Sequence, residues 1–75
     1  MKAYVLINVR AGQSRHVVNK LRQLEGVTSA DACWGRPDIF ALVEAKDDKA
    51  LANSVLDSIQ KIDGVESTDT HILIE

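Results

Sequence analysis

The chain repeats its own pattern 38 positions later, and this internal repeat limits it to two copies of one structural unit. Residues 21–29 read Leu-Arg-Gln-Leu-Glu-Gly-Val-Thr-Ser, and residues 59–67 read Ile-Gln-Lys-Ile-Asp-Gly-Val-Glu-Ser. The same register pairs Val17 with Val55. Each copy has the composition of a strand-helix-strand unit, and two copies account for residues 1–75. We therefore expect a single domain and no second one.

The size and charge of the chain limit which classes of partner it can bind. A chain of 75 residues buries only roughly 60% of its unfolded surface, so association with further copies is an expected source of stability. Nine basic and eleven acidic residues give a net charge of -2, and the basic residues are scattered along the chain. Because no basic stripe is present, the sequence argues against direct binding of nucleic acid. Its apolar runs have only the length of strands, which predicts a cytoplasmic protein without a membrane segment.

Periodicity predicts the order β-α-β-β-α-β. The first helix should begin at Ser14 as its N-cap and end at Gly26, and the second should be capped by Asp47 or Asp48 and end at Gly64. The second strand alternates small apolar residues with polar ones, as edge strands do. The strands are expected over residues 3–9, 27–34, 39–45 and 65–74.

Right-handed crossovers in both halves place the two helices on one face of a four-stranded antiparallel sheet, the ferredoxin-like α+β fold. Both alternating sets of side chains on the first and third strands are substantially apolar, so the face without helices would expose an apolar patch. We expect the sheet of a second copy to cover it, which gives a dimeric α+β barrel. The predicted dimer interface consists of Tyr4, Leu6, Phe40 and Leu42, because Asn8 and Glu44 fall on the same sides.

Residues that could carry catalysis are few. Nothing local brings Cys33 together with His16 or His71, so we interpret Cys33 as a small, partly buried side chain and not as a nucleophile. Asp47 and its neighbour open a helix, where negative charge is favourable. No cysteine pair with metal-ligand spacing and no glycine-rich phosphate loop is present. The sequence thus predicts no catalytic residue, no metal and no cofactor.

Two polar segments are candidates for ligand binding. Residues 34–38 read Trp-Gly-Arg-Pro-Asp and form a turn by composition, and residues 67–70 read Ser-Thr-Asp-Thr. The bland interpretation of the first segment is a hairpin connection. The functional interpretation is that both segments present backbone N–H groups and short polar side chains, which suit a small zwitterion.

The whole chain resembles the ligand-sensing domain of the Lrp/AsnC family, the feast/famine transcriptional regulators. The resemblance is carried by a strand reading Ala-Tyr-Val-Leu-Ile, two helices ending Leu-x-x-Leu-x-Gly-Val and Ile-x-x-Ile-x-Gly-Val, a Gly-x-x-Asp hairpin, and a threonine before Ile-Leu-Ile in the last strand. By this resemblance the effector-binding positions are Gly35, Asp38, Thr68 and Thr70.

The resemblance implies a non-enzymatic regulatory domain. Such domains dimerise through their sheet faces, gather into larger rings that are commonly octamers, and bind amino-acid effectors where dimers meet. Because the first strand starts at residue 3, the chain looks like the stand-alone form without a helix-turn-helix, which could also co-assemble with a full-length relative. Two other classes share the expected fold: a small dimeric barrel enzyme of the oxygenase or isomerase type, and a purely structural assembly unit. An amino-acid-binding domain of the ACT type has the same strand order.

Overall fold

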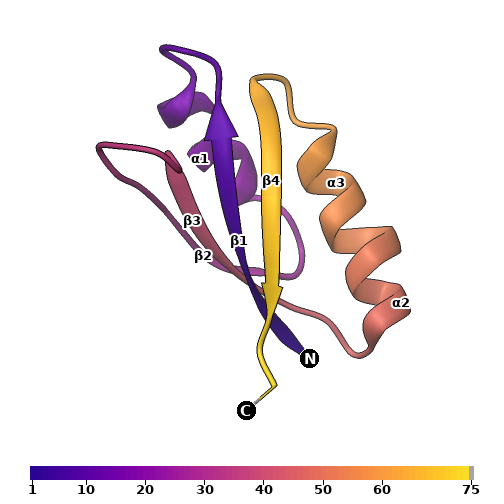
Figure 1. The fold of residues 1–75 in the computed structure, drawn as a ribbon. Coiled ribbons are helices and arrows are strands. Elements are labelled where there is room, and N and C mark those ends of the chain that lie inside the picture. The colour runs from indigo at the N-terminus through magenta and orange to yellow at the C-terminus, as the bar shows by residue number, and fades with distance from the viewer. Residues whose placement is uncertain (75) are drawn as a thin grey trace.

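The computed structural model describes residues 1–74, and its elements follow the predicted order (Figure 1). The second helix runs without a break through α2, a π-helical segment η1 and α3, since the residues at both junctions keep helical dihedral angles. The elements are β1 (Lys2–Val9), α1 (Ser14–Leu21), β2 (Val27–Ala32), β3 (Ile39–Glu44), α2 (Asp48–Ala50), η1 (Leu51–Leu56), α3 (Asp57–Gln60) and β4 (Val65–Ile72).

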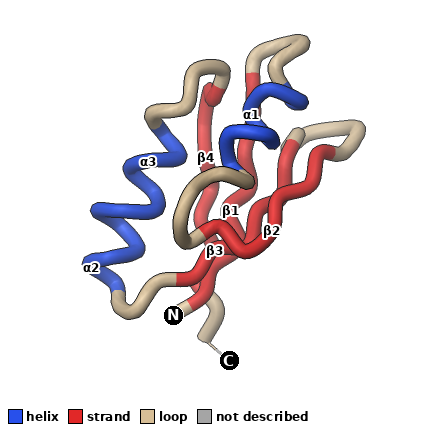
Figure 2. The backbone as a smooth tube through the Cα atoms, turned by 180° about the vertical axis from the view of Figure 1, so that it is seen from behind, coloured by secondary structure: helices blue, strands red, loops and turns tan. Residues whose placement is uncertain are grey.

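The four strands form one antiparallel sheet in the order β2-β3-β1-β4. The central strands β1 and β3 come from different halves of the chain, and the edge strands β2 and β4 flank them. Helix α1 lies behind the sheet in Figure 1 and in front of it in the reverse view of Figure 2. The predicted ferredoxin-like α+β fold is therefore confirmed.

The core lies between the helices and one face of the sheet. Alternate residues of the central strands point into it because side chains alternate sides along a strand. The fully buried positions are Ala3, Val5, Ile7, Ile39 and Val43 from the strands and Val17, Leu21 and Ile59 from the helices. The intervening residues of β1 and β3 therefore lie on the face opposite the helices, as the sequence predicted. We call this surface the open face.

The two halves pack against each other at their repeated glycines. The predicted helix ends at Gly26 and Gly64 are wrong, because α1 ends at Leu21 and α3 ends at Gln60, and turn residues follow each helix. Gly26 and Gly64 lie in those turns with positive φ of 93° and 106°. A Cβ on Gly26 would lie 2.7 Å from Val55, and a Cβ on Gly64 would lie 3.1 Å from Val17. Since Val17 and Val55 are also repeat partners, each half packs its glycine against the same valine of the other half.

Several boundaries differ from the predictions. Ser14 is the first residue of α1 and not its N-cap; Gln13 takes the cap position, and no side chain caps the helix. For the second helix the prediction is confirmed, because Asp47 accepts a hydrogen bond of 2.8 Å from the N–H of Ala50. Strands β3 and β4 end at Glu44 and Ile72, one and two residues before the predicted ends.

The end of the second strand differs as well. We predicted a strand over 27–34, but β2 stops at Ala32, where its pairing with Ile39 ends. Beyond that point residues 33–38 pair with no strand within residues 1–74, and Trp34 is fully exposed. Cys33 is exposed as well, which corrects its interpretation as partly buried. None of the helices within residues 1–74 is long and apolar enough to cross a membrane.

Candidate effector site

Residues 33–38 connect β2 to β3 and are anchored at both ends. The N–H of Cys33 donates to the carbonyl of Asp38 over 2.8 Å, which closes the loop, and the N–H of Asp38 donates to the carbonyl of Ile7 over 3.0 Å. Gly35, at the tip, has φ of 118° and no atom within 4 Å of where a Cβ would stand. The loop tip is therefore open to a ligand or another subunit, and its backbone conformation favours glycine.

The side chain of Asp38 braces this loop against the end of β1. Its Oδ2 accepts a hydrogen bond of 2.9 Å from the N–H of Val9 and lies 3.3 Å from Nη1 of Arg36. Only 18% of the Asp38 side chain is exposed, so the carboxylate faces the protein more than the solvent. The Asp38 carboxylate therefore holds the loop against the end of β1.

Arg36 links the loop to the last strand. Its Nη1 donates to the carbonyl of Val9 over 3.4 Å, and its Nη2 lies 3.3 Å from Oε1 of Glu66. The pairing of β1 with β4 shifts register here, from Asn8 opposite Ser67 to Val9 opposite Val65, so Glu66 is the extra residue of a β-bulge. Sequence reasoning missed both Arg36 and Glu66. An arginine inside the Gly-x-x-Asp turn was the available signal, whereas nothing in the sequence predicts the bulge.

The two threonines lie on the edge strand β4, on the side that faces the helices. Thr68 and Thr70 pair with Ile7 and Val5, whose side chains are buried beneath the helices. Thr68 accepts a hydrogen bond of 3.4 Å from Nε2 of Gln60 and lines a groove of about 400 Å³ to which Glu66 also contributes.

The structure brings only part of the predicted effector set together. Gly35 and Asp38 share one loop, and Arg36 connects that loop to the Glu66 end of the Thr68 groove. Thr70 does not line the groove. It stands four residues beyond Glu66, which is about 13 Å along a strand.

The open face carries the residues predicted for a dimer interface. Tyr4 and Phe40 are each 45% exposed, and Leu6 and Leu42 are half-buried. Tyr4, Leu6 and Phe40 line a shallow hollow of about 350 Å³ together with His71. This patch is apolar except at the β4 edge, where Nε2 of His71 lies 3.0 Å from Asp69.

The potential catalytic residues stay apart. Cys33 contacts the carbonyls of Pro37 and Asp38, His71 pairs with Asp69 on β4, and His16 lies exposed on α1. Among the residues that the structure describes, no three His, Cys, Asp or Glu side chains are placed to hold a metal ion.

Comparison with known proteins places this geometry in a family. The Lrp/AsnC ligand binding domain matches residues 2–75. The chain is 35% identical over 71 residues to an uncharacterised HTH-type transcriptional regulator of Pyrococcus abyssi. The aligned region covers 95% of this chain and 45% of that regulator. It is also 35% identical to the HTH-type transcriptional regulator FL11 of Pyrococcus abyssi, over 100% of this chain and 49% of FL11. The chain thus spans about half the length of the curated relatives that it matches.

Solved structures agree with the fold. TTHA0845 from Thermus thermophilus superposes with a TM-score of 0.90 at 30% identity, over 99% of this chain and 92% of that one. FFRP-DM1 gives a TM-score of 0.90 at 30% identity and covers 97% of both chains. The regulator NMB0573 from Neisseria meningitidis, solved as an L-Met complex, gives 0.83 at 22% identity over 99% of this chain and 49% of that one, a likeness of fold alone.

Proposed function

Since the chain belongs to the family of Lrp/AsnC ligand-binding domains, we propose that it binds an amino-acid effector where subunits meet and thereby shifts an assembly equilibrium. The family is a regulatory one and is generally non-enzymatic. A ligand shifts an equilibrium only by its difference in affinity for the two states. An effector held between dimers makes some of its contacts only in the assembled form, which supplies that difference.

One observation carries this proposal: the loop at residues 33–38 is open to solvent at its tip yet braced from beneath. Asp38 and Arg36 tie it to the N–H and the carbonyl of Val9, and Arg36 continues to Glu66 on the edge strand. A binding loop held in place loses little conformational entropy when a ligand arrives, which favours affinity. The regulator NMB0573, which shares this fold, forms a complex with L-Met, and this supports an amino acid as the class of effector.

The assembly that we propose starts from a dimer formed through the open face. Tyr4, Leu6, Phe40 and Leu42 form an apolar surface on both central strands, and contiguous apolar patches on soluble proteins commonly mark interaction sites. A second copy presents the same patch, so a two-fold arrangement covers both at once. Further association of dimers, up to an octamer, then brings the hairpin loops of neighbouring dimers within reach of effector.

The test of the effector site is a calorimetric and thermal-shift screen of the twenty amino acids, with light scattering on the same samples. We expect at least one amino acid to raise the melting temperature and to change the assembly size. Asp38→Ala should abolish binding because it releases the loop from Val9 and Arg36. Gly35→Val should do so because a β-branched residue strains the positive φ. Thr70→Val should weaken binding by about 1 kcal/mol, the usual contribution of one neutral hydrogen bond.

The control for these variants is Asp57→Ala, which removes an exposed carboxylate of α3 that pairs with Lys61, away from the hairpin and the open face. It should bind the effector as the parent does. If Asp38→Ala, Gly35→Val and Thr70→Val all bind like the parent, the effector site is not at the hairpin.

The proposed dimer is tested by Leu42→Asp, which places a charge in the middle of the apolar patch. We expect this variant to be monomeric or unfolded, because an unpaired buried charge is strongly destabilising. Asn53→Asp adds the same charge at an exposed helix position and should remain dimeric. A folded, fully dimeric Leu42→Asp protein, measured by light scattering, excludes the open face as the interface.

Any effect on DNA should be indirect. The net charge of -2 and the scattered basic residues offer no phosphate-binding surface, so the chain alone should produce no sequence-specific mobility shift. We propose that an influence on DNA binding appears only in mixtures with a full-length Lrp/AsnC regulator. A shift produced by this chain alone at moderate salt contradicts the proposal.

A further inference from the structure

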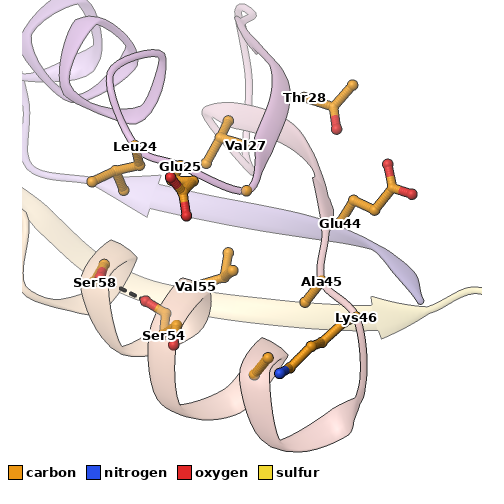
Figure 3. Close-up of a pocket in the computed structure, with 12 residues that line it drawn as sticks. Leu24, Glu25, Val27, Thr28, Glu44, Ala45, Lys46, Ser54, Val55 and Ser58 are labelled. Carbon is orange, nitrogen blue, oxygen red and sulfur yellow. Dashed lines mark hydrogen bonds between the residues drawn. The ribbon is translucent and has the colours of Figure 1, made fainter.

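A second recess lies on the helix side of the sheet, near the end of β3 opposite the hairpin. It measures about 680 Å³ and is bounded by the loop after α1, the segment that follows β3, and the second helix (Figure 3). We call it the helix-side groove. Strand β3 separates it from the hairpin by six residues, about 20 Å along the strand. The groove is therefore distinct from the proposed effector site, and it is complete within one subunit.

The wall of the groove nearest the core is apolar. Leu24 and Val27 come from the loop and the start of β2, and Val55 comes from η1. Figure 3 shows Val27 above and Val55 below the same space, with Ser54 and Ser58 along the helix. The hydroxyl of Ser58 donates to the carbonyl of Ser54 over 2.6 Å, so it is already satisfied within the helix.

Opposite charges border this apolar wall. Glu25 stands in the loop and Lys46 stands before the second helix; both are exposed and line the groove. Neither forms an ion pair or a side-chain hydrogen bond with any residue in 1–74. Glu44 also lines the groove, but strand alternation places its side chain with Leu42 toward the open face, so its backbone forms this part of the wall. The charges available to a ligand in the groove are thus one carboxylate and one ammonium group.

We propose that the helix-side groove binds a small zwitterion with an apolar body, namely an α-amino acid with an aliphatic side chain. Its carboxylate pairs with Lys46, whose flexible stem allows the ammonium group to follow the ligand. Its ammonium group pairs with Glu25, and its side chain packs against Leu24 and Val55. The volume of about 680 Å³ lies within the range of roughly 300–1,000 Å³ that is usual for small-molecule sites. Binding here requires neither the hairpin nor assembly.

The test is a titration of the isotope-labelled protein with L-leucine, followed through its backbone amide signals in NMR spectra. The amides of Gly26, Ser54 and Ser58 should shift and saturate. L-Leucinamide lacks the carboxylate, and N-acetyl-L-leucine lacks the ammonium group. Because each analogue loses one of the two proposed ion pairs, each should bind the parent protein at least about tenfold more weakly than L-leucine does. The proposal is overturned if about 20 mM L-leucine, enough to saturate a millimolar site, moves none of these amides.

Matched variants separate groove binding from other effects. Ser54→Leu fills the groove from an exposed helix position and should remove these amide shifts, whereas Asn53→Leu adds the same side chain one residue away, outside the groove. Lys46→Met should weaken L-leucine by at least about tenfold and abolish its preference over L-leucinamide. Lys49→Met removes an ammonium group that does not line the groove and should change neither.

The result also distinguishes the two proposed sites. Asp38→Ala should leave the Gly26, Ser54 and Ser58 shifts intact even where it abolishes effector binding at the hairpin. Unchanged L-leucine binding in both Ser54→Leu and Lys46→Met overturns the groove as a site, and it does so whether or not the hairpin binds an effector.

Discussion

The two halves of the chain share one pattern but differ in how their helices begin. Helix α1 starts at Ser14, whose repeat partner is Ala52, whereas the second helix starts at Asp48, four residues earlier. The extra turn is capped by the side chain of Asp47 and leads into the π-helical segment, while α1 has no side-chain cap. The turns that follow the two helices nevertheless contain equivalent glycines, Gly26 and Gly64, both with positive φ.

This comparison teaches which contacts the fold requires. The core positions and the glycine–valine contacts are equivalent in both halves, so we interpret them as the contacts that packing the two repeats together requires. The features unique to one half lie at the periphery, and both proposed sites are there. The hairpin joins the two halves, and the extra turn of the second helix contributes Ala50 to the helix-side groove. We therefore expect function where the repeat symmetry of the two halves breaks down.

Truncating equivalent core residues tests whether the two halves contribute equally to stability, and it should give the largest effect. Leu21 and Ile59 are repeat partners, and both are fully buried. Leu21→Ala and Ile59→Ala should each lower the free energy of unfolding by about 3 kcal/mol, through lost apolar burial and the cavity left behind. Urea titrations of both variants measure this. A difference of more than about 2 kcal/mol between them contradicts an evenly shared core.

The repeated glycines should give a smaller effect and an unequal one. In Gly26→Ala the new Cβ lies 2.7 Å from Val55 and 3.2 Å from the carbonyl of Glu44, whereas in Gly64→Ala the nearest atoms are at 3.1 Å. Both variants also strain a positive φ. We expect a loss of about 2–3 kcal/mol for Gly26→Ala and about 1–2 kcal/mol for Gly64→Ala. Equal losses in urea titrations show that backbone strain, and not contact with the valine, sets the cost.

Addition of Val55→Ala identifies the source of the larger loss. The double variant Gly26→Ala/Val55→Ala should be less destabilised than the sum of its single variants, because the smaller side chain relieves the clash. Strict additivity excludes the contact between Gly26 and Val55 as the cause.

The caps should give the smallest of these effects. Asp47→Ala removes the hydrogen bond to Ala50 and should cost about 1 kcal/mol, whereas Gln13→Ala removes no capping bond. Thermal unfolding of the two variants compares the helix starts directly. A loss at Gln13 as large as that at Asp47 contradicts the asymmetry between the halves.

The fold could be predicted largely from the sequence because its determinants are local. Alternation along the central strands identified the buried face, and apolar spacing with terminal glycines located the helices. Only part of the candidate site was accessible in the same way. Gly35 and Asp38 belong to a recognisable turn, but the contacts of Arg36 with Val9 and Glu66 join the hairpin to two strands, β1 and β4, and no local pattern encodes them.

By itself, the sequence determined the number of units, the order of elements, the turn glycine that follows each helix and the apolar character of both sides of the central strands. These follow from repeat spacing, side-chain periodicity and the conformational freedom of glycine. Tertiary structure alone decided that β2 ends at Ala32 and leaves Trp34 exposed, that the bulge at Glu66 meets the hairpin, and that Glu25 and Lys46 border one groove. The reason is physical: strand ends, bulges and grooves depend on which segments become neighbours, and only the packed chain establishes that.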